Sequence, residues 1–227
     1  MSTEMPPQRR DSEVIQILAT EHWSLLATRA LTYQESLGRV TMFLTVLSGA
    51  VIALALVAQA DHFGAAFISV AIFMLTVVFF VGLLTVRRLL MLNLDDYMWV
   101  VAMNRLRHAY LELHPELEPN FTTSAHDDLA GVLQTLGVEP LGASRIGSLF
   151  HSLVTLPGML GTIVAAVGGA IGALIAAGFG APAVLVLLVG LVFFLAALSL
   201  VAVWGRSSVR TPSPSLNPRF PSPKAKG

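Results

Sequence analysis

The feature that most constrains this chain is a set of four long apolar runs that contain no Asp, Glu, Lys, Arg or His. The runs cover residues 40–59, 63–86, 158–177 and 182–204. A helix rises 1.5 Å per residue, so about 20 residues cross the roughly 30 Å hydrocarbon core of a bilayer. Only 12% of the chain is charged, against about 25% in soluble domains. The sequence therefore predicts an all-α polytopic membrane protein with four transmembrane helices.

Short connections pair these runs in sequence. Residues 60–62 separate the first two runs, and residues 178–181 separate the last two. A connection this short joins two helices as an antiparallel hairpin. We expect one transmembrane hairpin over residues 39–86 and a second over residues 158–204.

The distribution of basic residues predicts an orientation. All 14 Lys and Arg residues lie in the N-terminal arm, the central loop or the tail, and the two hairpin tips carry none. Basic side chains stay in the cytoplasm during insertion, so both termini and the central loop are predicted to be cytoplasmic. The preference for Arg over Lys, with abundant Ala, Val, Leu and Gly, is typical of a GC-rich bacterial genome. We therefore expect the bacterial plasma (inner) membrane.

The remaining segments are polar or amphipathic. Residues 11–38 repeat apolar side chains at helical spacing, which predicts an amphipathic cytoplasmic helix. Residues 87–157 are predicted to be a cytoplasmic helical region, in which Ser124 starts a short helix and Gly137 ends it. Residues 1–10 and the basic, Pro/Ser-rich residues 205–227 are predicted to be disordered.

The third run carries a face of small residues. Its members recur every four residues in two adjacent rows and include Gly161, Ala165, Gly168, Gly169, Gly172, Ala173, Ala176 and Ala177. Helices in lipid associate through close backbone approach along such faces. The face predicts a tight helix contact, either with the fourth run of the same chain or between subunits of an oligomer.

A local basic stretch in the central region is the candidate contact for a ligand. It consists of Asn104, Arg105, Arg107 and His108. Such a stretch is suited to an anionic lipid or a cytoplasmic ligand, and a solvated helix face is the alternative interpretation.

Metal-ligand side chains also gather in this region. They are His108, Glu112, His114, His126, Asp127 and Asp128. No two of the histidines have an established ligand spacing, and two prolines intervene before His126. We interpret the group as solvated loop residues and predict no metal and no cofactor.

The first half of the chain resembles a known type of hairpin protein. Its order is an amphipathic helix, EHWSLLATRALTYQESLGR, then a short-turn hairpin, then a long helix, MNRLRHAYLELHPELEP. This organisation, over residues 15–115, is similar to uncharacterised membrane proteins of high-GC bacteria and more loosely to SLATT-type hairpins. The SLATT resemblance implies a pore-forming effector in a bacterial conflict system and transfers no functional residue.

These features favour a non-enzymatic protein. No catalytic triad, paired-carboxylate site or phosphate loop is visible, and zero net charge gives no field for nucleic-acid binding. The leading hypothesis is a homo-oligomer in the bilayer that forms a passive pore, since no ionisable group in the runs would serve coupled transport. The alternative is a membrane-anchored interaction protein that presents its cytoplasmic helices to a partner. A membrane enzyme acting near Asp95, Asp96 or His108 is a third possibility.

Overall fold

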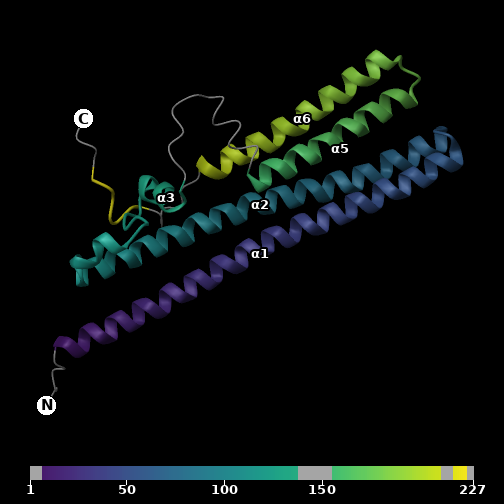
Figure 1. The fold of residues 1–227 in the computed structure, drawn as a ribbon. Coiled ribbons are helices and arrows are strands. Elements are labelled where there is room, and N and C mark those ends of the chain that lie inside the picture. Colours follow the sequence, from purple (N-terminus) through teal and green to yellow (C-terminus); the bar gives the residue numbers. More distant parts are fainter. Residues whose placement is uncertain (1–6, 138–154, 211–216, 224–227) are drawn as a thin grey trace. The chain divides into compact units, whose positions relative to one another are not determined.

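The structure is a computed structural model that describes residues 7–137, 155–210 and 217–223. Its regular elements are all helical: α1 (Pro7–Asp61), α2 (Ala65–Leu113), the short 3₁₀ helix η1 (Pro115–Asn120), α3 (Leu129–Thr135), α5 (Leu156–Gly178) and α6 (Ala183–Arg210) (Figure 1). The all-α fold class is therefore confirmed for the described residues.

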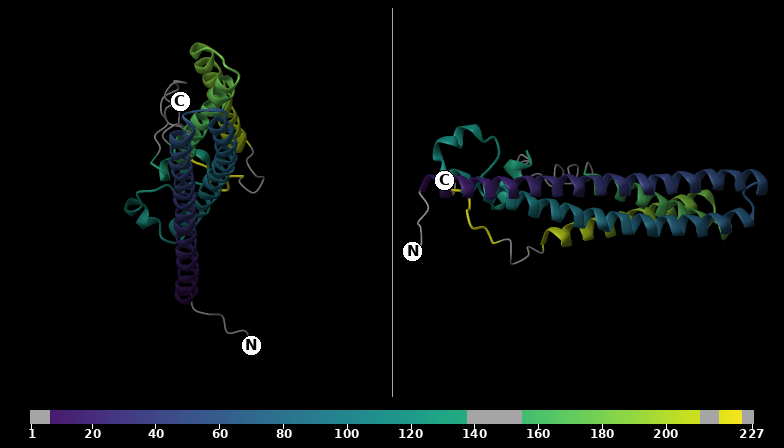
Figure 2. Two further views of the ribbon diagram at one scale, coloured as in Figure 1. Left: turned by 90° about the vertical axis from the view of Figure 1, so that its right-hand side faces the viewer. Right: turned by 90° about the horizontal axis from the view of Figure 1, so that it is seen from below.

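Four of these helices, α1, α2, α5 and α6, are long and apolar enough to cross a membrane. Helices α1 and α2 extend well past their apolar runs, to 55 and 49 residues. The predicted amphipathic helix 11–38 and the run 40–59 are one unbroken helix, as both views of Figure 2 show. No proline lies in the interior of α1, so nothing in the sequence breaks the helix at residue 38.

The chain forms two compact units, and α1 and α2 contribute to both. The polar unit comprises Met1–Gln34, Asn93–Ala143 and Pro212–Gly227. The hydrophobic unit comprises Glu35–Leu92 and Ser144–Thr211. Each unit has its own buried core.

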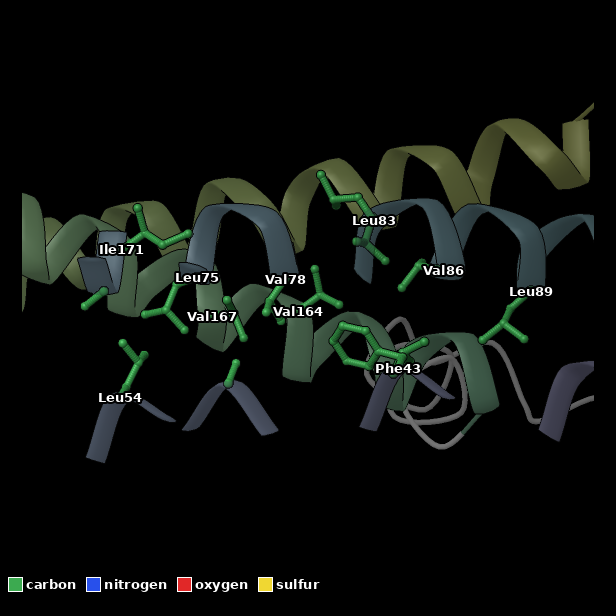
Figure 3. Close-up of a cluster of buried hydrophobic side chains, with 14 of the residues drawn as sticks. Phe43, Leu54, Leu75, Val78, Leu83, Val86, Leu89, Val164, Val167 and Ile171 are labelled. Carbon is green, nitrogen blue, oxygen red and sulfur yellow. The ribbon is translucent and has the colours of Figure 1, made fainter. Parts of the chain in front are cut away.

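The core of the hydrophobic unit is built mainly from α1, α2 and α5 (Figure 3), with Val201 of α6 also buried in it. Phe43 of α1 and Val164 of α5 are almost fully buried against α2. They approach α2 at Gly82, where a Cβ atom would lie 2.5 Å from Val164 Cγ2 and 2.9 Å from Phe43 Cε2. Glycine at this position is therefore what lets both side chains reach the helix.

The polar unit has a small apolar core and a larger share of polar contacts. Val100 and Val101 of α2 pack with Val132 of α3. Arg29 of α1 pairs with Asp96 of α2 at 2.6 Å. Asp128, rather than the predicted Ser124, caps α3, because its carboxylate accepts the Gly131 N–H at 2.9 Å. Gly137 follows α3 with a positive φ of 66°, the conformation expected of a residue that ends a helix.

The structure differs from the predicted disorder at both ends. Residues 7–10 belong to α1, residues 205–210 belong to α6, and residues 217–223 take a defined path beside α3 (yellow in Figure 1). The composition of residues 217–223 predicts disorder. It cannot reveal the hydrogen bonds that this segment makes to acidic side chains remote from it in sequence. The rest of the predicted disordered ends and residues 138–154 of the central region lie outside the described residues.

Candidate functional site

The small-residue face of α5 lies against α6 and α2 within one chain. A Cβ atom at Gly161 would be 2.7 Å from Val201 Cγ1, and one at Gly169 would be 3.0 Å from the Gly190 carbonyl oxygen. At Gly172 the Phe193 ring would be 2.6 Å away. The remaining members of the face are the buried Ala165, Gly168 and Ala176, the half-buried Ala173 and the exposed Ala177. The contact is thus made along most of the face by neighbours from the same chain.

Asn104 forms a buried polar hub in the polar unit. Its side chain is fully buried, and Nδ2 donates to the His126 carbonyl oxygen at 2.7 Å. Oδ1 accepts from Arg107 Nη1 at 2.6 Å and from Thr135 Oγ1 at 3.0 Å. Because one side chain bonds α2, α3 and the loop between them, Asn104 fixes the loop that carries Asp127 and Asp128.

Arg107 belongs to this same hub through its hydrogen bond to Asn104. The side chain is buried, and burial lowers its pKa, with the positive charge of Arg29 lowering it further. Among the described residues no carboxylate forms an ion pair with Arg107. Two of the four predicted contact residues, Asn104 and Arg107, thus hydrogen-bond to each other within the polar unit.

Asp127 is the centre of the candidate site. Its side chain is fully buried, and it accepts the Arg219 N–H at 2.9 Å and the Phe220 N–H at 2.8 Å. Arg105 Nε donates to the same carboxylate at 2.7 Å. The Asp127 N–H in turn donates to the Phe220 carbonyl oxygen at 3.2 Å. One residue thus binds both polar groups of the Phe220 backbone.

Asp128 extends this contact by one step along the segment. Its Oδ2 accepts the Ser222 N–H at 3.0 Å, and its Oδ1 accepts the Ser222 hydroxyl at 2.7 Å. The carboxylate also caps α3 at Gly131. The beginning of α3 and the C-terminal segment are therefore held by one side chain.

Arg105 and His108, the other two predicted contact residues, touch the segment directly. Arg105 Nη2 donates to the Asn217 carbonyl oxygen at 3.1 Å. The His108 ring stacks on Phe220 with ring centroids 3.8 Å apart and an interplanar angle of 22°. Arg105, His108, Asp127 and Asp128 together form what we call the segment site, and residues 217–223 are the docked segment.

The electrostatics of the segment site keep both carboxylates ionised. Burial on its own raises the pKa of Asp127, but hydrogen bonds from Arg219, Arg105 and Phe220 outweigh it, and the net pKa is lowered. Asp128 follows the same pattern, with burial opposed by hydrogen bonds from Gly131 and Ser222. Both side chains are therefore negatively charged acceptors at neutral pH.

The histidines and glutamates beside this site do not converge on a metal position. His108, Glu112 and His126 line one pocket of about 490 Å³, and His108 Nε2 lies 3.6 Å from Glu112 Oε1. Within residues 7–137, 155–210 and 217–223, no three His, Cys, Asp or Glu side chains are placed to hold a metal ion. The interpretation of Asp127 as a solvated loop residue is wrong, because its side chain is buried beneath the docked segment.

The sequence predicted part of this site and did not predict the docked segment. The basic stretch led to Arg105 and His108. Phe220 and Ser222 were not identified, since a proline-rich segment remote in sequence from α2 gives no pairing signal. The sequence signal that could have indicated a remote partner is the adjacent pair Asp127 and Asp128, because their own loop contains no Lys or Arg to pair with these carboxylates.

Comparison with known proteins finds no family model, no curated protein and no solved structure that matches this chain.

Proposed function

We propose that this chain is a membrane-anchored interaction protein of the bacterial plasma membrane. The four apolar helices hold it in the bilayer as two hairpins, with both termini and the polar unit in the cytoplasm. The charge distribution supports this orientation, because every Lys and Arg lies outside the hairpin tips.

The observation that carries the proposal is the segment site. A buried carboxylate that accepts two successive backbone N–H groups is a means of binding a peptide, as it satisfies groups that every peptide offers. The hydrophobic unit shows no comparable site, since its described core is made of interlocking apolar side chains. Binding therefore belongs to the polar unit and anchoring to the hydrophobic unit.

In-cell photo-cross-linking tests this function. A photoreactive residue at Leu129, which is 62% exposed on α3, should give an adduct with a partner protein. The same residue at Leu187, 73% exposed on α6, is the matched control and should cross-link to lipid. Equal cross-linking to protein from both positions, or none from Leu129, would contradict an interaction role for the polar unit.

The homo-oligomeric pore is a second candidate, favoured by the outer face of α1. This face carries exposed small and hydroxyl-bearing residues, including Thr41, Thr45, Ser48 and Gly49. Nothing approaches within 4 Å of a Cβ atom built at Gly49. The exposed face of α6 carries Leu187, Leu191 and similar side chains suited to lipid, whereas α1 exposes both these small residues and large apolar ones such as Ile52. Small faces bring helices together in membranes, so α1 is the surface on which copies would meet.

Conductance of the purified protein in planar bilayers tests the pore. A Gly49→Leu variant should abolish channel events and shift the protein to monomers in mild detergent. An Ala183→Leu variant, at the exposed start of α6, should change neither. A monomeric, electrically silent wild-type protein would dismiss this second candidate.

A further inference from the structure

We propose that the segment site is a receptor for a proline-rich segment of a different protein, and that residues 217–223 occupy it as a ligand in cis. This inference rests on the proposed interaction function and names its ligand class. The docked segment, Asn-Pro-Arg-Phe-Pro-Ser-Pro, shows what the site recognises.

The site binds backbone N–H groups at three positions of the segment. Asp127 accepts those of Arg219 and Phe220, and Asp128 accepts that of Ser222. The positions between and beside them, 218, 221 and 223, are prolines, which have no N–H to donate. Prolines thus occupy positions where the site needs no donor, and they hold the segment extended before it binds. The spacing of donors and prolines is the pattern that a competing ligand must share.

Two side chains of the segment are also recognised. Phe220 stacks on His108, and the Ser222 hydroxyl donates to Asp128 at 2.7 Å. The Arg219 side chain is exposed and forms no ion pair with any described carboxylate. The site therefore binds the backbone of residue 219, the aromatic ring of residue 220 and the hydroxyl group of residue 222. A ligand needs an aromatic residue followed by Pro-Ser.

The docked segment is suited to exchange. Asn217, Pro218, Arg219, Pro221 and Pro223 are exposed, and only Phe220 and Ser222 are half-buried. A segment with so little buried surface stays bound largely because it is part of the same chain, which gives it a high effective concentration at the site.

A foreign ligand has an additional contact to gain. The 490 Å³ pocket that shares His108 with the segment site is lined by residues of α2, η1, the following loop and α3, and by none of residues 217–223. A second copy of this chain would bring the same segment and leave the same pocket unfilled. A different protein whose flanking residues enter the pocket gains contacts that the cis segment lacks. We therefore assign the ligand to a different protein.

The test compares two full-length chains that differ at one residue of the segment. Arg219→Pro removes an N–H that Asp127 accepts and should release the cis segment, while Arg219→Ala keeps that N–H and is the matched control. A fluorescent peptide with the sequence of residues 217–223 is titrated into each protein in lipid nanodiscs. It should bind the Arg219→Pro chain at least about tenfold more tightly, because the cis competitor is gone.

Two further arms make the result decisive. A peptide that itself carries the Arg219→Pro change should not bind either chain. Adding Asp127→Asn to the Arg219→Pro chain should abolish binding, and circular dichroism verifies that this chain keeps its helices. Peptide binding that is absent from the Arg219→Pro chain, or equal in both chains, would overturn the inference.

The source of the ligand is tested by mixing copies. An Asp127→Asn chain has a segment without a site, and the Arg219→Pro chain has a site without a usable segment. A mixed complex that forms more tightly than the isolated peptide binds would reassign the ligand to a second copy and overturn the assignment to a different protein. If the peptide does not bind while Leu129 still cross-links a partner, the inference fails and the proposed function stands.

Discussion

The two units of this molecule are held together by opposite chemistry. In the hydrophobic unit, apolar side chains pack against glycines along α1, α2, α5 and α6, and the steric complementarity of the helices determines this packing. In the polar unit, buried Asn104 and Asp127 organise hydrogen bonds around a three-valine core. We therefore expect the stability of the hydrophobic unit to be sensitive to added side-chain volume and that of the polar unit to the loss of hydrogen-bond partners.

The largest expected effect comes from adding volume to the hydrophobic unit. Gly172→Leu would place a side chain where the Phe193 ring already lies 2.6 Å from the added Cβ. Overpacking a tight helix contact should lower the free energy of unfolding by about 3 kcal/mol. Thermal unfolding in detergent measures this loss. Gly38→Leu on α1 meets nothing within 4 Å and should be nearly neutral, so equal losses from both variants would contradict the glycine contact.

The next effect comes from removing a hydrogen-bond hub from the polar unit. Asn104→Ala would leave the His126 carbonyl oxygen, Arg107 and Thr135 without their partner. Unsatisfied buried groups of this kind should cost about 2 kcal/mol of unfolding free energy. Hydrogen exchange across α3 should accelerate in the variant. Asn93→Ala, at an exposed position of the same helix, is the control and should leave exchange unchanged.

The comparison also explains how much of the fold the sequence could reveal. The apolar runs predicted the four helices because exclusion of charge over about 20 residues is a local property of the chain. The division at residue 38 between an amphipathic segment and an apolar span stays a prediction, and the structure adds that one helix covers both, since a change from amphipathic to apolar composition does not require a break in a helix. Without a proline or a capping signal, one helix serves both units.

The segment site lay mostly beyond sequence reasoning because it joins remote residues. Asp127 and Phe220 are 93 positions apart, and neither belongs to a periodic pattern. Composition favours disorder for residues 217–223, and their order depends on carboxylates that the segment itself does not contain. The basic stretch led to Arg105 and His108 for an electrostatic reason, yet the group they meet is a backbone and a ring rather than an anion.

A third, more local effect is the release of the docked segment by acid. The pKa values of Asp127 and Asp128 are lowered in the folded protein from an ordinary value of 3.8. Their stabilising contribution is therefore complete above about pH 3.8 and is lost as the pH falls through the lower folded-state values. A fluorophore attached at exposed Asn217 should become mobile in this acidic window. The predicted spans contain no ionisable side chain, so the far-ultraviolet dichroism of the whole protein, which comes from its helices, should change little with it.

The smallest expected effect tests the charged edge of the hydrophobic unit. Arg88 Nε donates to Glu35 at 3.0 Å and Arg39 Nε donates at 2.8 Å, and these bonds, Arg88 first, lower the Glu35 pKa to about 2. Arg88→Gln should raise that pKa toward the ordinary 4.5, and Arg39→Gln should raise it less. Carbon-13 titration of the labelled Glu35 carboxyl measures both shifts.

Little stability should follow from this pair, even where its titration is clear. The Arg88 and Glu35 side chains are 38% and 35% exposed, and solvent screens ion pairs at such positions. Because the folded-state pKa is depressed, whatever the pair contributes is present above pH 4.5 and is lost between pH 4.5 and about 2. A large stability loss in Arg88→Gln at neutral pH would mean that charge, and not shape alone, holds the hydrophobic unit, which would remove the contrast between the two units.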